Sequence, residues 1–216
     1  MKGKSIKMLL NSATRQKVKT NLLKFSRQFK RPKLPQIAEG EINLHLGCGF
    51  VNHPHFINID ALALPHIHYI RSIGDLSPFA DNSVNLIYAS HSLEHFSHLE
   101  TATVLAEWFR VLKKGGTLRL SVPDFDLLVD IYRKHNNNVE AILHTLMGSQ
   151  NYQFNFHMTA FNQASLERLL KEAGFVKIQP WEPGDSELTT FNDFSIAKLP
   201  VEGKEYPVSL NLEAIK

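Results

Sequence analysis

The chain has 216 residues, of which 43% are hydrophobic and 21% are charged, and its formal net charge is +3. With no internal repeat or low-complexity stretch, this composition excludes a disordered chain and provides for one sizeable globular core. A single cysteine excludes an intramolecular disulfide, and no apolar run has the length of a membrane span or of a signal peptide. We therefore expect a cytoplasmic protein.

The start of the chain is a basic arm. Eleven of the 24 lysines and arginines precede the first carboxylate, Glu39. The rest of the chain carries the other 13 cations and all 21 carboxylates, which gives it a net charge of −8. Apolar side chains recur in the arm at the spacing of one helical face, at Val18, Leu22, Phe25 and Phe29. Pro32 ends this pattern. We expect a basic amphipathic helix and linker over residues 1–35 and an acidic folded domain over residues 36–216.

Three interpretations of the arm stay open. Its helix could pack on the domain, lie on an anionic membrane surface as a peripheral contact, or bind nucleic acid. The aromatic and leucine side chains on one face favour packing or lipid over phosphate, so nucleic acid is the least favoured partner.

From residue 42 onward, strand patterns alternate with helix patterns, which predicts a mainly parallel sheet with helices on both faces. The expected strands cover residues 42–46, 56–60, 67–70, 84–89, 117–122, 175–181 and 208–215. The expected helices cover residues 99–112, two parts of 125–147 separated near Asn136, and 164–173. A pair of glycines, Gly115 and Gly116, is the expected stop of the first helix.

The first expected strand runs into a glycine turn, Gly47-Cys48-Gly49, and the second ends at Asp60. Glycine is needed where the backbone turns sharply against a ligand, and Asp60 is placed to accept hydrogen bonds from ribose hydroxyls. The pattern predicts a nucleotide-like ligand. A nicotinamide dehydrogenase is disfavoured, because the first crossover is short, Asn52 replaces the third glycine and the acid comes early.

Three later segments, at residues 74–96, 107–124 and 157–175, follow the glycine turn in a fixed order. Together with it they resemble class I S-adenosylmethionine-dependent methyltransferases of the broad type 11 kind, over residues 42–216. The resemblance implies S-adenosylmethionine as cofactor and a Rossmann-like seven-stranded α/β sheet with an antiparallel final strand. His45 departs from the pattern, since the family usually has an acid at that position. The cofactor-binding residues that the resemblance implies are Gly47, Cys48 and Gly49 at the amino-acid part, Asp60 at the ribose, Asp75 and Leu76 at the adenine, and Ser90 and His91 at the methionine end.

The residues expected to be catalytic are His91, Glu94, His95 and His157. The first three also fit H-x-x-E-H, the inverted zinc-protease motif, but their place after a nucleotide loop argues against a peptidase. Methyltransferases of ubiquinone biosynthesis and of small-RNA 3′ ends carry a similar E-x-x-E-H with a later histidine, and use a divalent ion to hold the acceptor hydroxyl. Here His91 replaces the first glutamate, which would favour a transition metal over Mg²⁺. The favoured alternative is a metal-free helix opening, in which Glu94 caps the helix and His95 packs. Without a metal, His91 or His95 would remain as the general base.

The function that these residues predict is methyl transfer to an oxygen, less favourably a nitrogen, of a small-molecule or glycan-type acceptor. Such a displacement needs collinear, dry reactants rather than a nucleophile triad. The acceptor is expected under a cover formed by residues 123–161 and 182–207. The alternative from another class is a non-catalytic, cofactor-binding or membrane-tethered adaptor, which His45 and the short first crossover favour.

Overall fold

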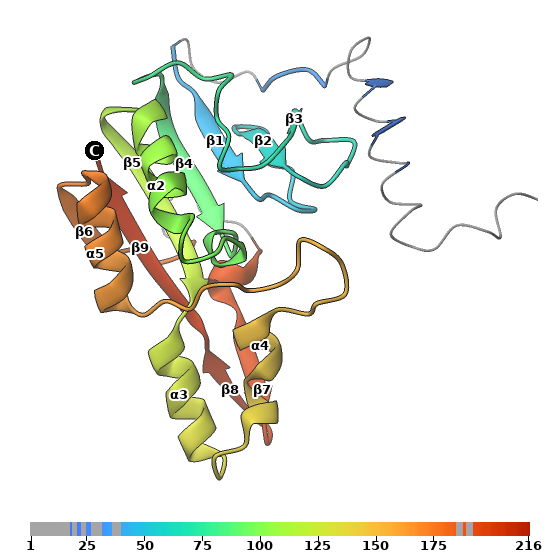
Figure 1. Ribbon diagram of the computed structural model, residues 1–216, viewed down its shortest axis with the longest axis vertical. Helices are drawn as coiled ribbons and strands as arrows, with labels where there is room; N and C mark the ends of the chain where they lie inside the picture. Colours follow the sequence, from blue (N-terminus) through green and yellow to red (C-terminus); the bar gives the residue numbers. More distant parts are fainter. Residues whose placement is uncertain are drawn as a thin grey trace, which may run out of the picture.

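The computed structural model describes residues 40–184, 188 and 192–216, together with residues 18, 21–22, 25–26 and 32–35. Its main sheet has seven strands in the order β3-β2-β1-β4-β5-β9-β6 (Figure 1). The final strand, β9, is antiparallel to both of its neighbours, and the other pairs are parallel. The expected Rossmann-like sheet is confirmed. Its strands are β1 (Asn43–Leu46), β2 (Ile57–Asp60), β3 (Tyr69–Ile70), β4 (Val84–Ser90), β5 (Leu112–Pro123), β6 (Lys177–Pro180) and β9 (Ser209–Ile215).

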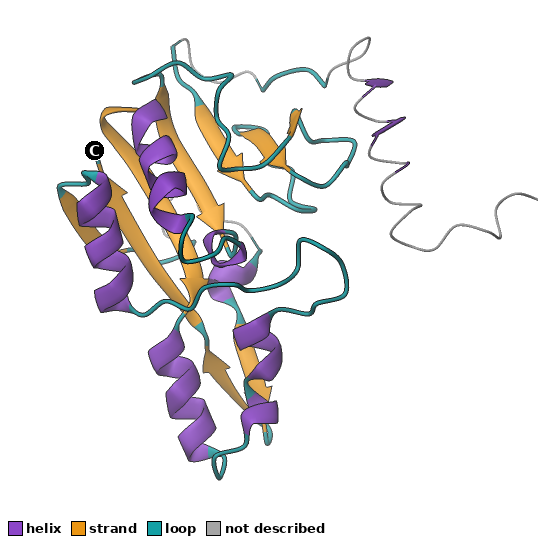
Figure 2. Ribbon diagram, in the orientation of Figure 1, coloured by secondary structure: helices purple, strands orange, loops and turns teal. Residues whose placement is uncertain are grey.

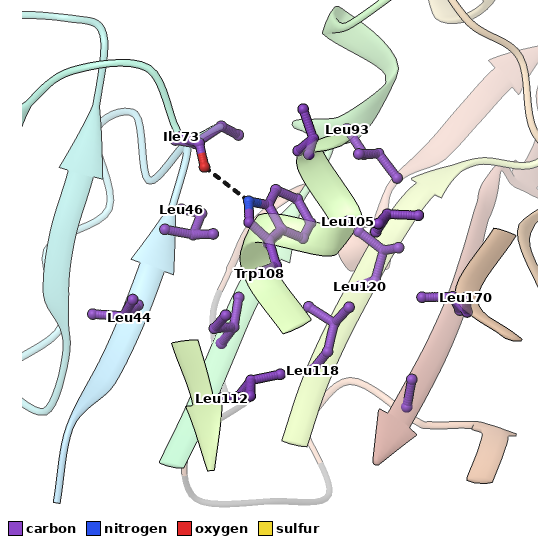
Figure 3. Close-up of a cluster of buried hydrophobic side chains, with 14 of the residues drawn as sticks. Leu44, Leu46, Ile73, Leu93, Leu105, Trp108, Leu112, Leu118, Leu120 and Leu170 are labelled. Carbon is purple, nitrogen blue, oxygen red and sulfur yellow. Dashed lines mark hydrogen bonds between the residues drawn. The ribbon is translucent and has the colours of Figure 1, made fainter. Parts of the chain in front are cut away.

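Two helices, α2 (Thr101–Val111) and α5 (Gln163–Ala173), pack side by side on one face of the sheet (Figure 2). Apolar residues of α2 recur at helical spacing and bury Trp108 completely in the main core. The indole Nε1 of Trp108 donates a hydrogen bond to the carbonyl oxygen of Ile73 at 2.8 Å (Figure 3). Because this bond satisfies the one polar atom of the ring, the ring can be buried at no cost in unpaired polar groups.

The opposite face of the sheet carries a smaller cluster of Phe56, Leu86 and Tyr88, against which Trp181 packs. His45 points to this face, because side chains alternate along β1 and its neighbours in the strand belong to the main core. Its ring makes edge contacts with Phe56 and Tyr88 at centroid distances of 5.9 and 5.1 Å. Burial lowers the pKa of His45 to about 3, so the ring is neutral. His45, which stands where the family usually has an acid, therefore packs against the aromatic residues on this face of the sheet.

An extension beyond the carboxyl end of the sheet has a core of its own, made by Leu128, Ile131, Ile142 and Val208. Its elements are α3 (Phe125–Lys134), η3 (Val139–Ala141), α4 (Leu143–Met147) and a hairpin of β7 (Lys198–Val201) and β8 (Lys204–Pro207). The two helical parts agree with the expected break near Asn136. The hairpin is an addition that the sequence reasoning missed.

One connection differs from expectation and another agrees with it. The first helix ends at Val111 and β5 begins at once, so Gly115 and Gly116 lie in an irregular stretch of the strand instead of stopping the helix. The link from β1 to β2 consists of turns, as its short length predicted.

In the arm, the described residues Val18, Leu22 and Phe25 are helical and have 44%, 64% and 61% of their surface exposed. Phe29, the fourth apolar position, and most of the arm's cations lie outside the described residues. The boundary at residue 35 stays a prediction.

Candidate active site

The strands that carry the expected site residues end at one edge of the sheet. Chain order reverses between β1 and β4, which lie next to each other in the middle of the sheet. In open α/β sheets the crevice at such a reversal is where ligands bind. Gly47 follows β1, Asp60 ends β2, and Ser90 ends β4 and is buried. These three positions therefore lie together at the edge of the sheet where such a crevice is expected.

The glycine turn has two different glycines. Gly47 has φ of +66°, and a Cβ built on it would lie 2.2 Å from the hydroxyl oxygen of Ser92, so this position is packed from above. Gly49 has φ of +52°, and a Cβ there would meet nothing within 4 Å. The turn is therefore anchored at Gly47 and open at Gly49, as a ligand lying along the backbone requires. Cys48 between them is 3% exposed, and burial followed by the charge of Asp60 raises the pKa of its thiol, so the thiol stays protonated.

Asp60 is fixed by two backbone donors. The amide of Gly49 donates to its Oδ2 at 2.8 Å, and the amide of Leu62 donates to its Oδ1 at 2.7 Å. Burial raises the pKa of the carboxyl, and these two hydrogen bonds oppose the rise. Each oxygen keeps a second lone pair. The carboxylate is thus held in one orientation and can accept two further hydrogen bonds.

Asp75 and Leu76 follow β3. The carboxylate of Asp75 pairs with Arg71 at 3.1 Å and is half exposed, while the side chain of Leu76 is fully buried in the main core. The backbone amide of Leu76 donates to Glu107 at 2.9 Å. An adenine contact by Asp75 stays a prediction, and Leu76 has neither its side chain nor its amide free for that purpose.

The four expected catalytic residues, His91, Glu94, His95 and His157, come together; we call them the Glu94 cluster. Nδ1 of His91 lies 3.4 Å from Oε1 of Glu94, and Nε2 of His157 lies 3.8 Å from the same oxygen. The rings of His95 and His157 meet edge to face with centroids 4.9 Å apart. Glu94, His95 and His157 each place one ligand atom within 4.8 Å of the others.

Local backbone geometry explains how the cluster forms. His91 has φ of +47°, which turns the chain sharply after β4 and leads into a single 3-10 turn, η2 (Leu93–His95). His157 comes from the loop between α4 and α5. That loop is attached to η2 because the amides of Met158 and Thr159 donate to the carbonyl oxygen of Glu94, at 2.7 and 3.2 Å.

Burial dominates the electrostatics of the Glu94 cluster. Glu94 is 1% exposed, and loss of solvation raises its pKa to about 8. Loss of solvation also lowers the pKa of His91 to about 3 and of His157 to about 4, with neighbouring histidines adding to both shifts. The pKa of His95 falls for the same reason, opposed by hydrogen bonds to the backbone carbonyls of Phe156 and His91. The three imidazoles are neutral at pH 7.

Some neighbours of the site gave no signal in the sequence. Ser209, at the start of β9, lies with its Oγ 2.8 Å from Nε2 of His91. Phe194, 67% exposed, lies with its ring 5.5 Å from that of His91. Burial raises the pKa of the Tyr152 phenol, and the negative charge of Asp60 raises it further, so Tyr152 lies near Asp60. Each comes from a distant segment of the chain, so only tertiary structure reveals it.

The proteins that match this chain in sequence are methyltransferases. The model of a methyltransferase domain matches residues 51–120. The C-methyltransferase UbiE of ubiquinone/menaquinone biosynthesis from Blochmanniella floridana is 26% identical over 54% of this chain and 48% of its own length. A demethylmenaquinone methyltransferase from Chlorobaculum parvum is 24% identical over 69% of this chain and 68% of its own. The chain spans about half the length of the first of these relatives.

Solved structures agree on the fold. A SAM-dependent methyltransferase from Archaeoglobus fulgidus has a TM-score of 0.50 at 16% identity, with 94% of each chain covered. A SAM-dependent methyltransferase from Thermotoga maritima, described as a possible histamine N-methyltransferase, has a TM-score of 0.51 at 16% identity over the same shares. The fold is that of the class I S-adenosylmethionine-dependent methyltransferases, and both the family model and the sequence matches are to methyltransferases. Within that class, the sequence matches reported above are to methyltransferases of quinone biosynthesis.

The residues of the crevice fit the cofactor of this class, S-adenosylmethionine. Gly49 leaves open space where a side chain would stand, and Asp60 presents a fixed carboxylate with two accepting lone pairs. A ribose offers two hydroxyl donors to such a carboxylate.

No helix among the described residues is long and apolar enough to cross a membrane.

Proposed function

We propose that this protein transfers the methyl group of S-adenosylmethionine to an oxygen of a small-molecule acceptor. The observation that carries the proposal is the position of the Glu94 cluster. It begins one residue after the end of β4, beside the crevice that Gly49 and Asp60 border. Groups that accept protons or hydrogen bonds thus stand next to the expected place of the reactive methyl.

Each expected cofactor residue has a proposed part. The turn Gly47-Cys48-Gly49 receives the amino-acid portion along its backbone, Asp60 binds the ribose hydroxyls, and Ser90 borders the methionine end. Asp75 remains the proposed contact for the adenine. Leu76 is proposed only as a packing residue beneath that position, because its amide is bonded to Glu107.

The cofactor, when bound, supplies a methyl group on a positively charged sulfur. The residues of the chain then hold an acceptor hydroxyl in line with that methyl and exclude water. A neutral imidazole of the Glu94 cluster accepts the hydroxyl proton as the new C–O bond forms and the C–S bond breaks. Burial keeps these imidazoles neutral, so that a lone pair can accept the proton, but it also weakens them as bases, so the step suits an acidic hydroxyl such as that of a phenol.

The surroundings of the Glu94 cluster favour an acceptor with an apolar or ring-shaped face. Phe154, Phe156 and Met158, from the loop that carries His157, are 42%, 42% and 57% exposed. The ring of Phe194 also lies next to that of His91, with centroids 5.5 Å apart. Aromatic faces of this kind stack on planar rings and on the apolar faces of sugars. Phenols and glycan-type hydroxyls are therefore the proposed acceptor classes.

A methyl-transfer screen tests the proposal. Phenolic, amine and glycan acceptors are each incubated with labelled S-adenosylmethionine, and S-adenosylhomocysteine binding is measured by calorimetry in parallel. We expect binding, and label on a hydroxyl. Label on a carbon would instead indicate C-methylation, the reaction named for the relative from Blochmanniella floridana. Binding without transfer to any acceptor would support the non-catalytic adaptor, and the absence of binding would overturn both functions.

A further inference from the structure

The hydrogen bonds around the Glu94 cluster fix the tautomer of its histidines. Nδ1 of His157 faces the carbonyl oxygen of Thr145 at 3.0 Å, and Nδ1 of His95 faces the carbonyl oxygen of Phe156 at 3.1 Å. A carbonyl oxygen only accepts, so both Nδ1 atoms carry the hydrogen. In a neutral imidazole the other nitrogen, Nε2, then carries a lone pair.

His91 is fixed in the opposite tautomer. Its Nε2 lies 2.8 Å from Oγ of Ser209, and that hydroxyl donates its one hydrogen to the carbonyl oxygen of Phe194 at 2.7 Å. The hydroxyl oxygen must therefore accept from His91, so Nε2 carries the hydrogen and Nδ1 the lone pair. Nδ1 is the atom that lies 3.4 Å from Glu94.

The inner side of the cluster therefore consists of acceptors. Two nitrogen lone pairs, Nδ1 of His91 and Nε2 of His157, face the same oxygen of Glu94 at 3.4 and 3.8 Å. Among the described residues, no other residue donates a hydrogen bond to either oxygen of this 1% exposed carboxylate. A proton on the carboxyl could bond to one of the facing lone pairs and would leave the others unpaired. A cation bound between them satisfies all of them at once.

We propose that Glu94, His95 and His157, with His91 beside them, bind one divalent transition-metal ion. Two imidazoles and a carboxylate suit Zn²⁺, Co²⁺ or Fe²⁺ better than Mg²⁺, which prefers oxygen ligands. The backbone carbonyls behind His95 and His157 are the outer contacts that orient imidazoles toward a metal. Ligand atoms within 4.8 Å of one another need only a small contraction to meet one ion. Three ligands leave a coordination position for an acceptor oxygen, a role that rests on the proposed function.

Metal uptake by the full chain tests the inference. Protein stripped with a chelator is titrated with Co²⁺, and visible absorption, bound metal by elemental analysis and the thermal midpoint are recorded. Variants Glu94→Gln and His157→Gln remove proposed ligands. His98→Gln is the matched control, because His98 is exposed and lies three residues beyond His95. We expect one equivalent of Co²⁺ with tetrahedral absorption bands in the parent and in the control, and affinity at least about 100-fold weaker in both ligand variants.

The Glu94→Gln variant also separates a lost ligand from a damaged fold. Its side-chain amide supplies hydrogens to the lone pairs around it, so we expect the metal-free variant to unfold at or above the thermal midpoint of the metal-free parent, with no rise on adding Co²⁺. Equal Co²⁺ binding by Glu94→Gln and His98→Gln, or no bound equivalent in the parent, would overturn the metal centre. S-adenosylhomocysteine affinity, measured on the same samples, reports separately on the proposed function.

Discussion

At the scale of single residues, the two glycines of the turn illustrate what the sequence shows and what it hides. The pattern Gly47-Cys48-Gly49 was sufficient to place a tight turn after the first strand. It could not show that one glycine is packed under Ser92 while the other faces open space, because Ser92 reaches the turn only in the folded chain.

Gly47→Ala is expected to destabilise the protein, because the added Cβ would meet Ser92 and the residue has a positive φ. The positive φ alone costs about 1 kcal/mol, and we expect a total loss of about 2 to 4 kcal/mol in the free energy of unfolding. Gly203→Ala is the control, since Gly203 has φ of +79° and open space around it. Chemical denaturation of both variants measures the difference, and equal losses would contradict the packing argument.

Asp60→Ala is expected to weaken S-adenosylhomocysteine binding by about 100-fold or more, since charge-assisted bonds to two hydroxyls contribute roughly 1.5 to 3 kcal/mol each. Calorimetry on the variant, with Asp130→Ala on the exposed surface of α3 as control, measures the loss. Parent-like affinity in Asp60→Ala would mean that the cofactor site is assigned to the wrong residues.

At the scale of elements, hydrophobic periodicity predicted all seven strands of the main sheet to within a few residues of their observed bounds, except that β5 starts five residues early. Strong apolar runs between turn residues explain this success. The hairpin of β7 and β8 was missed because each strand has only four residues and none of them is fully buried, which gives a weak hydrophobic pattern. The convergence of His157 with Glu94 depends on the loop between α4 and α5, whose path has no periodic signal.

The start of α5 provides an element-scale prediction. The side-chain oxygen of Asn162 accepts from the amide of Ser165 at 3.0 Å, and the amide of Asn162 donates to Oγ of Ser165 at 3.0 Å. Asn162→Ala removes this capping box and is expected to lower the free energy of unfolding by about 1 kcal/mol. Gln163→Ala, one residue further along the exposed helix surface, is the control. A thermal midpoint that falls equally in both variants would contradict the capping argument.

At the scale of the whole molecule, charge divides the chain into a basic arm and an acidic remainder. The described apolar side chains of the arm are exposed, which favours a surface contact over packing on the domain. We propose that residues 1–33 bind anionic membranes peripherally, since each cation near such a surface contributes about 1 kcal/mol.

Deletion of residues 1–33 is expected to abolish co-sedimentation with anionic vesicles at low salt and to leave S-adenosylhomocysteine binding unchanged. High salt should release the full chain as well, because screening weakens the attraction of the arm. Neutral vesicles serve as the control. Equal co-sedimentation of the two proteins at low salt would exclude the membrane role.

The central claim is that a methyl group passes from the cofactor in the β1/β4 crevice to an acceptor oxygen at the Glu94 cluster. Nuclear magnetic resonance with S-adenosylmethionine labelled with ¹³C at the methyl, in the presence of phenolic and glycan acceptors, tests it most directly. The account predicts a product with an O–¹³CH₃ signal for the parent and for His98→Gln, and a signal at least about 100-fold weaker for Glu94→Gln. Labelled product at carbon or nitrogen only, or undiminished transfer by Glu94→Gln, would contradict it.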